Sequence, residues 1–363
     1  MAEMKKFGDF ASFKYGKMPD KKKLTESGKY PVYSGYRYVG YYDEYNTDAN
    51  QIIVVARGVG GTGDVKLTKE RCYLTNLSIS ADIDENVALP EFIYYFFMPR
   101  NLRYLDSGSA QSQITISDLE KVMIPLPSLS EQRAICGYMK MLDNKIEINE
   151  EINDNLQEQA IAIYSNMVID KADDSWSTGV LSDVAEITMG QSPKGDTYNE
   201  EGVGTVFFQG RAEFGFRFPT RRLFTTDPKR MANANDALMS VRAPVGDMNV
   251  AYEDCCIGRG LSAIRSKDNH QSFVLYTMLA LREELNVFNG EGTVFGSINR
   301  DALNSMPINI PPIAVMDQFE EIVAPMDATI RNNYDEICRL EAIRDSLLPR
   351  LMSGELDLSD LDL

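Results

Sequence analysis

The sequence offers few residues with which to build a catalytic centre. It has a single histidine, His270, and five cysteines without a CxxC spacing, which argues against a Ser–His or Cys–His nucleophile pair and against a metal site. It contains no GxxxxGK(S/T) loop to hold the phosphates of ATP. It also lacks the (D/N)PP(Y/F) motif of adenine methyltransferases. The sequence therefore predicts a binding protein, not an enzyme, with no metal or cofactor of its own.

Contact with nucleic acid is the chemistry that the side chains suit best. Residues 20–50 are rich in tyrosine and lysine, and residues 207–230 are rich in phenylalanine and arginine. Arginine beside aromatic rings suits contacts to phosphate oxygens and to base edges. The alternative is that the rings form strand cores and the cations a solvated rim. The candidate contact residues are Lys21, Lys22, Lys23, Arg57, Ser109, Gln111, Gln113, Arg211, Arg217, Arg221, Arg222 and Arg242.

Two of these candidates occupy matching positions in the chain. Arg57 and Arg242 each lie near the end of a short β-rich run, at 53–58 and 238–243, just before a tight turn. One expectation is that they face DNA. The other is that they satisfy carbonyl groups inside their own domains, and the sequence leaves both open.

The candidate residues lie on two copies of one repeat. The openings of the copies match, because Gly16 and Pro19 recur with the same spacing as Gly190 and Pro193. Their ends match as well, because LEKVMIPLP at 119–127 parallels LNSMPINIP at 303–311. The sequence therefore predicts a tandem duplication of a unit of about 184 residues, made of a mixed α/β domain, a proline-rich strap and a long helix.

A long helix is expected after each strap, the first over 129–170 with Ser130 as its N-cap. Apolar residues recur with a period of 3.5 in both stretches, which is typical of helices that pack lengthwise on each other. Asn149 and Asn333 stand at the same place in the two seams, and a buried Asn favours one register over slipped ones. The alternative is two amphipathic helices of a larger core with Asn at its margin. The first seam comprises Ile135, Met139, Leu142, Ile146, Asn149, Asn153, Leu156, Ala160, Ile163 and Met167.

The net charge of −17 at first argues against a nucleic-acid partner. However, the segments 129–174 and 313–363 carry net charges of −6 and −8, so most of the negative charge lies on the helices. Residues 1–128 have a net charge of 0 and residues 175–312 of −3, so either segment can present a basic face. No apolar run is long enough to span a bilayer and no signal core begins the chain, which predicts a cytoplasmic protein without a membrane partner.

Three stretches carry a resemblance to a known family. They are IPLPSLSEQRAI at 124–135, LDNKI at 142–146 and SLLPRLMSGEL at 346–356. Together they resemble the DNA-specificity subunit of type I restriction–modification systems, and the resemblance covers essentially the whole chain. The second strap departs from the pattern because Asp317-Gln318 stands where the first has Glu131-Gln132.

The resemblance implies an α+β fold in tandem-repeat arrangement. Two similar mixed α/β target-recognition domains, at 1–128 and 175–312, would be separated by two long antiparallel coiled-coil helices, at 129–174 and 313–363. Each domain would read one half of a split site in double-stranded DNA. The helices would set the unread gap and dock two methyltransferase (modification) subunits.

The resemblance also implies that restriction (motor–nuclease) subunits complete the enzyme. S-adenosylmethionine, ATP and Mg²⁺ would then belong to those partner subunits, and none to this chain. The alternative is an interaction scaffold that no longer reads DNA, such as a silent or degenerate copy.

Overall fold

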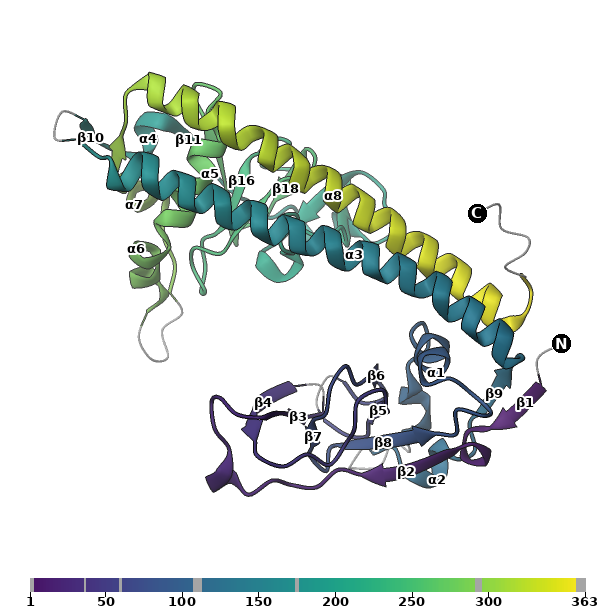
Figure 1. Cartoon of the computed structure of the whole chain (residues 1–363). Coiled ribbons are helices and arrows are strands. Elements are labelled where there is room, and N and C mark those ends of the chain that lie inside the picture. Colours follow the sequence, from purple (N-terminus) through teal and green to yellow (C-terminus); the bar gives the residue numbers. More distant parts are fainter. Residues whose placement is uncertain are drawn as a thin grey trace. The chain divides into compact units, whose positions relative to one another are not determined.

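The computed structural model describes residues 3–35, 37–58, 61–106, 113–173, 176–290 and 296–356. The chain divides into two compact units (Figure 1). Unit 1 comprises Met1–Asn149 and Tyr334–Leu363, and unit 2 comprises Glu150–Asn333. Each unit contains one sheet-rich domain and parts of both long helices, so the division at 128, 174 and 312 expected from the sequence stays a prediction.

Unit 1 builds its domain from three small sheets. One has the order β2-β8-β5-β6 and is antiparallel, the second has the order β4-β3-β7 with β3 and β7 parallel, and β1 pairs with β9. Its strands are β1 (Glu3–Lys6), β2 (Ala11–Tyr15), β3 (Tyr30–Ser34), β4 (Arg37–Tyr42), β5 (Ile52–Val55), β6 (Val65–Leu67), β7 (Tyr73–Leu74), β8 (Ser78–Ile83) and β9 (Met123–Leu126). Its short helices are η1 (Phe7–Asp9), η2 (Lys21–Lys23), α1 (Pro90–Phe97), η3 (Leu102–Leu105) and α2 (Ile116–Leu119).

Unit 2 repeats this topology. Its sheets have the orders β11-β19-β16-β17, β12-β14-β13-β18-β15 and β10-β20, with β13 and β18 parallel. Its strands are β10 (Ser177–Val180), β11 (Ala185–Met189), β12 (Tyr198–Asn199), β13 (Thr205–Phe208), β14 (Leu223–Thr225), β15 (Met231–Ala232), β16 (Ala237–Ser240), β17 (Met248–Val250), β18 (Cys255–Ile257), β19 (Leu261–Ser266) and β20 (Pro307–Ile310). Its short helices are α4 (Leu181–Val184), η5 (Gly195–Thr197), η6 (Arg211–Glu213), α5 (Gln271–Ala280), α6 (Arg282–Asn286), η7 (Val287–Asn289) and α7 (Arg300–Asn304).

The two domains therefore share one strand order, which confirms the tandem duplication and the α+β class expected from the sequence. β2, β8, β5 and β6 correspond to β11, β19, β16 and β17, and the strap pair β1–β9 corresponds to β10–β20. Unit 2 differs in extending its second sheet by β12 and β15. The copies thus keep a common frame and vary at the second sheet.

One helix in each unit joins the sheet to a long helix. The aromatic residues of α1 enter the core beside β5 and β6, and α5 packs on β16 and β19. Tyr95 of α1 donates a hydrogen bond to Asp143 (2.7 Å), and Tyr276 of α5 donates one to Asp327 (3.0 Å). Asp143 and Asp327 occupy equivalent positions in the two copies of the repeat, so the duplication has reproduced this junction as well.

The first long helix, α3 (Leu129–Tyr164), continues as one π-helical stretch, η4 (Ser165–Asp170). The prediction that Ser130 is its N-cap was wrong. Ser128 caps it instead, because its hydroxyl accepts from the Glu131 backbone N–H (3.3 Å) while the Glu131 carboxylate accepts from the Ser128 N–H (2.8 Å), a capping box. Gln132 is fully buried and donates to the carbonyls of Val87 and Pro127, which ties the helix to its domain.

In unit 2 a different side chain ties the long helix to its domain. Gln318 is exposed, so it is not the counterpart of Gln132. Glu320 of α8 (Ile313–Ser353) instead accepts from the backbone N–H groups of Ser272 (3.1 Å) and Phe273 (3.3 Å) at the start of α5. The departure seen in the sequence therefore reflects a different side chain, which ties α8 to the domain of unit 2 as Gln132 ties α3 to the domain of unit 1.

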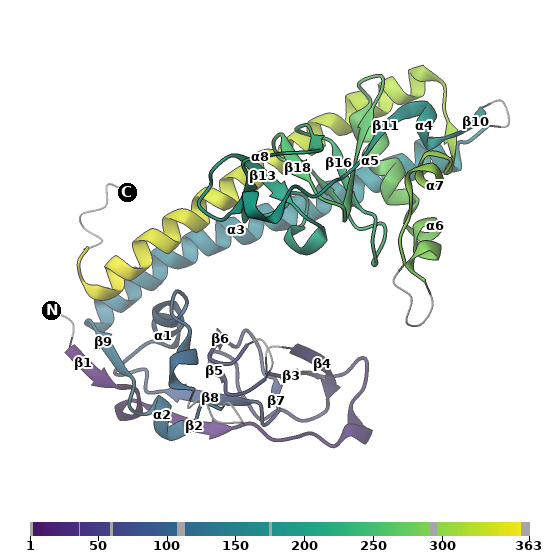
Figure 2. The same ribbon diagram turned by 180° about the vertical axis from the view of Figure 1, so that it is seen from behind.

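Within each unit α3 and α8 run antiparallel, as both views show (Figure 1 and Figure 2). In unit 1 Arg344 bonds Asp143 (3.0 Å) and Asn149 bonds Glu336 (2.8 Å). In unit 2 the side chain of Asn333 donates to Asn153 (2.9 Å). All ten predicted positions of the first seam, nine in α3 and Met167 in η4, are buried or half-buried. None of the described helices is long and apolar enough to cross a lipid bilayer.

The buried Asn pair provides a test of how the seam is specified. Replacing Asn333 with Ala leaves Asn153, which is 3 % exposed, without its partner and should lower the free energy of unfolding by about 1–3 kcal/mol. Replacing both Asn153 and Asn333 with Leu should cost far less, because no polar group is then left unpaired. Urea denaturation of the two variants checks this. Equal losses in both variants would contradict it.

Candidate nucleic-acid interface

Unit 1 presents a basic surface around β3 and β4. Residues 14–42 contain seven Lys or Arg residues and two Asp or Glu residues, a net charge of +5. All seven cationic side chains belong to exposed residues. Lys21, Lys22 and Lys23 form η2, which Asp20 caps by accepting from the Lys22 N–H (3.0 Å). The structure therefore gathers the predicted lysines on a cationic surface of an acidic chain.

Tyrosines lie among these cations. The Lys29 ammonium lies 5.1 Å from the centre of the Tyr30 ring, and the Tyr38 and Tyr41 rings are 5.5 Å apart. Tyr38 is 50 % exposed, whereas Tyr42 is buried against Tyr73. The tyrosines thus divide between a small core and a solvent-facing set next to positive charge, an arrangement that suits contact with a nucleic acid.

Arg57 and Arg242 lie at equivalent strand ends, but their side chains have different surroundings. Arg57 is half-buried and donates from Nη2 to the Asn76 carbonyl (3.3 Å), while its buried Nε has no partner among the described residues. Arg242 is exposed. Arg57 therefore fits the scaffold alternative better, and Arg242 remains accessible for DNA.

Arg221 and Arg222 are about half exposed and already held by carboxylates. Arg221 pairs with Glu253 (2.5 Å), and Arg222 pairs with Glu200 (3.3 Å) and with the buried Glu213 (2.6 Å). The hydrogen bond and charge of Glu213 raise the pKa of Arg222. Replacing Arg222 would leave a buried carboxylate without its cation, so this residue has a structural task whatever else it contacts.

Arg217 is the candidate that the structure places away from solvent. It is 6 % exposed, pairs with Asp327 (3.3 Å) and donates to the Tyr276 hydroxyl (3.1 Å). The sequence did not indicate this burial, because Arg217 lies in the same phenylalanine- and arginine-rich stretch, 207–230, as the exposed arginines. Arg217 therefore anchors the domain of unit 2 to α8 through Asp327, and its side chain is withdrawn from solvent.

Of the three remaining loop candidates, Gln113 alone belongs to the described residues. Gln113 is half-buried, just before Ile114, whose N–H bonds the Ala56 carbonyl (2.9 Å). Ser109 and Gln111 lie outside the described residues.

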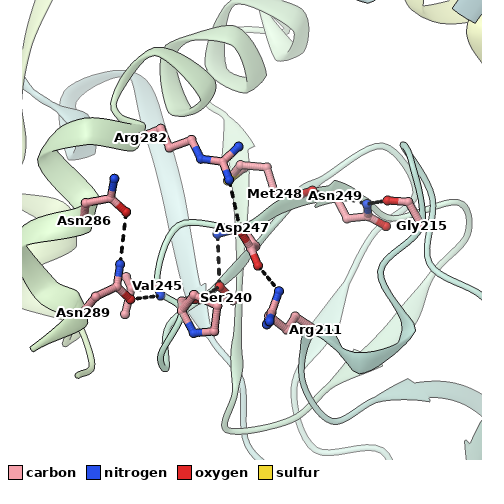
Figure 3. Close-up of polar contacts among 11 residues, drawn as sticks. Arg211, Gly215, Ser240, Val245, Asp247, Met248, Asn249, Arg282, Asn286 and Asn289 are labelled. Carbon is pink, nitrogen blue, oxygen red and sulfur yellow. Dashed lines mark hydrogen bonds and ion pairs between the residues drawn. The ribbon is translucent and has the colours of Figure 1, made fainter. Parts of the chain in front are cut away.

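The structure brings together one cluster in unit 2 that the sequence did not predict. Asp247, half-buried after the turn that follows β16, accepts from Arg211 of η6 and faces Arg282 of α6 at 3.7 Å (Figure 3). Arg282 was not among the predicted residues. A signal for the turn was present, because Gly63-Asp64 and Gly246-Asp247 occupy equivalent positions in the two copies of the repeat.

This site does not resemble a metal or catalytic centre. Over the described ranges, no group of three or more His, Cys, Asp or Glu side chains converges to hold a metal ion. Each unit by itself presents exposed cationic side chains near aromatic rings, lysine with tyrosine in unit 1 and arginine with phenylalanine in unit 2. Such groups bind phosphate and base edges.

Comparison with known proteins identifies the family. The sequence profile described as "Type I restriction modification DNA specificity domain" matches residues 2–158 and 173–342. The chain belongs to this family. It is therefore the non-catalytic DNA-specificity subunit of a type I restriction–modification system, with one match for each copy of the repeat.

Individual relatives agree with this assignment. The chain is similar to the MjaX type I restriction enzyme specificity subunit of Methanocaldococcus jannaschii, with 29 % identity over 75 % of this chain and 69 % of that one. It shares 23 % identity with the MjaIX specificity subunit of the same organism, over 79 % and 74 % of the two chains. Its fold resembles the crystal structure of the type I S subunit from Mycoplasma genitalium, with a TM-score of 0.64, 20 % identity, and coverage of 96 % and 95 %.

Proposed function

We propose that each domain of this specificity subunit reads one half of a split site in double-stranded DNA. The observation that carries the proposal is that the two domains share one strand order but expose different kinds of side chain. Unit 1 presents exposed lysine and tyrosine around β3 and β4, whereas unit 2 presents arginine around η6 and the β16–β17 turn. A common frame with different surfaces suits two domains that read different sequences.

The pair formed by α3 and α8 is proposed to set the number of unread base pairs and to dock two methyltransferase subunits. Both helices are far longer than ordinary globular helices, and the segments 129–174 and 313–363 that contain them carry net charges of −6 and −8. Acidic surface suits protein partners better than phosphate. Restriction (motor–nuclease) subunits would complete the complex in the cytoplasm, and the partner subunits would bring S-adenosylmethionine, ATP and Mg²⁺.

Methylation mapping tests the proposal directly. The full chain is co-expressed with its methyltransferase subunits in a host that lacks other adenine methylation, and the genome is sequenced with detection of methyladenine. We expect one new split motif with an unread gap of fixed length. If the complex assembles and no such motif appears, the chain is an interaction scaffold or a silent copy that no longer reads DNA.

The lysines of η2 give a quantitative prediction. Lys22→Gln with Lys23→Gln removes two exposed charges, so the slope of log affinity against log salt should become shallower by about two, with affinity lower for every DNA sequence. Fluorescence anisotropy of the full complex over a salt series measures this. Lys6→Gln with Lys121→Gln removes the same charge from the strap end of unit 1 and serves as the control. Identical slopes for the two double variants would remove η2 from the interface.

A further inference from the structure

The turn between β16 and β17 holds one carboxylate in a fixed position. The Ser240 hydroxyl accepts from the Asp247 N–H (3.1 Å), and the Ser240 N–H bonds the Asp247 carbonyl (2.9 Å). Gly246 has a φ of +92° and lies against Leu285, so a larger residue would be both strained and obstructed. From the other side, Asn289 of η7 accepts from the Val245 N–H (Figure 3). The backbone of the turn is therefore held by Ser240 on one side and by Asn289 on the other, which places the Asp247 carboxylate.

Two guanidinium groups from different elements converge on this carboxylate. Arg211 comes from η6 and contacts one oxygen, and Arg282 comes from α6 and lies 3.7 Å from the other. Their side chains are 49 % and 69 % exposed, and a guanidinium has five N–H donors, so both arginines keep donors for a further partner. The cluster has one more positive than negative charge, unlike Arg222, which has two carboxylates. It is a place where an oxyanion is already accommodated between two arginines.

The cluster lines a cavity of about 310 Å³ within unit 2. Phe216, 48 % exposed, and Asn249, 2 % exposed, line the same cavity. The Asn249 amide donates to the Gly215 carbonyl (2.9 Å), but its buried Oδ1 has no partner in the part of the chain that the structure describes. The cavity thus offers cations, an aromatic ring and an unused acceptor, the groups that a nucleotide would engage.

We propose that Arg211 and Arg282 bind a backbone phosphate of the DNA strand that unit 2 reads, and that this phosphate takes the place of the Asp247 carboxylate between the two arginines. The inference rests on the proposed function of the chain. Two guanidiniums that approach one point from separate elements match the two free oxygens of a phosphate, whereas a base edge is usually met by one side chain in bidentate contact. The equivalent Asp64 of unit 1 bonds the neutral amide of Asn101 (2.6 Å), so this phosphate contact is specific to unit 2.

The variants predict changes of opposite sign. Arg211→Ala and Arg282→Ala each remove one phosphate contact, so each should weaken binding about tenfold and make the salt slope shallower by about one. Asp247→Asn removes a negative charge beside the phosphate, so it should strengthen binding. If the cluster only stabilised the fold, all three variants would weaken binding together. Because phosphate contacts carry no sequence information, the methylated motif should stay the same in every variant.

The full chain, assembled with its methyltransferase subunits, is titrated by fluorescence anisotropy on a duplex carrying the motif found by methylation mapping. Arg300→Ala, which removes the same charge from α7, should leave the slope unchanged, and Asp64→Asn should not strengthen binding. The inference is overturned if Arg211→Ala and Arg282→Ala behave like Arg300→Ala, or if Asp247→Asn weakens binding. If the wild-type complex shows no motif-specific binding, the proposed function fails and the phosphate contact fails with it. If the wild type binds its motif and the Arg211 and Arg282 variants have the same affinity and salt slope as the wild type, the phosphate contact alone is refuted.

Discussion

Lengthening both long helices by four residues is expected to widen the unread DNA gap by about two base pairs without changing either half-site. Four helical residues add roughly 6 Å, and each base pair rises by about 3.4 Å. The insertions belong after Glu151 in α3 and after Asn333 in α8, next to the boundaries between the compact units at Asn149 and Asn333. There they leave all but the first two residues of unit 2 joined to the rest of that unit.

The sequence itself supplies suitable inserts. Repeating INEE, residues 148–151, in α3 and IRNN, residues 330–333, in α8 adds one further Asn–Asn layer beside the Asn153–Asn333 pair. A four-residue insertion shifts the seam by only about half a residue and should be tolerated. Methylation mapping of the variant measures the gap directly.

A single residue inserted after Glu151 is the matched control. It should rotate the apolar stripe of α3 by about 100°. Leu156, Ala160 and Ile163 would then leave the seam, and Tyr164 would lose its hydrogen bond to Thr277 (2.9 Å). Methylation should be lost. If the four-residue variant methylates with an unchanged gap, the helices do not set the spacing.

Replacing Asp327 with Ala is expected to destabilise unit 2 by about 3–5 kcal/mol, because it leaves the buried guanidinium of Arg217 without its carboxylate. The single tryptophan of the chain, Trp176, belongs to unit 2, so its fluorescence during urea denaturation reports on this unit. Asp227→Ala, which breaks an exposed pair with Lys229, is the control and should have little effect. Equal losses for the two variants would show that the buried pair is not needed.

The same pair should respond to pH in a defined direction. Burial raises the pKa of Asp327, although Arg217 acts against this rise. A carboxyl whose pKa is higher in the folded than in the unfolded state holds its proton more tightly when folded. Its contribution to stability is therefore complete below the unfolded value and is lost as the pH rises through the folded value.

A hydrophobic replacement of the pair should reveal this dependence. Arg217→Met with Asp327→Leu should keep most of the stability at neutral pH, since neither charge remains buried. As the pH falls through the folded-state pKa of Asp327, the wild type should gain stability relative to this double variant. A constant difference in unfolding free energy across that range would contradict the assignment.

The sequence by itself determined the parts of this protein that depend on neighbours along the chain. The period of 3.5 predicted α3 and α8, because a helix that keeps one face buried must repeat its apolar residues at that interval. The two matching straps predicted the duplicated domains, since each unit needs the same local pattern to form the same sheets. Together with the strap and C-terminal motifs, these features were enough to indicate the family.

Only the tertiary structure decided which individual polar residues are buried and which partners they contact. Arg217 and Arg221 look alike in the sequence, yet one is buried beside Asp327 and the other is half exposed. Arg211, Asp247 and Arg282 meet although they are distant in sequence, because the start of η6, the β16–β17 turn and the start of α6 lie close together in unit 2. The N-cap of α3 is Ser128 and not the predicted Ser130, because the strap ends at Ser128 and the Glu131 carboxylate can accept from its N–H. The partner of a charged or hydrogen-bonding side chain depends on which elements pack together, and the local periodicity of the sequence does not predict this packing.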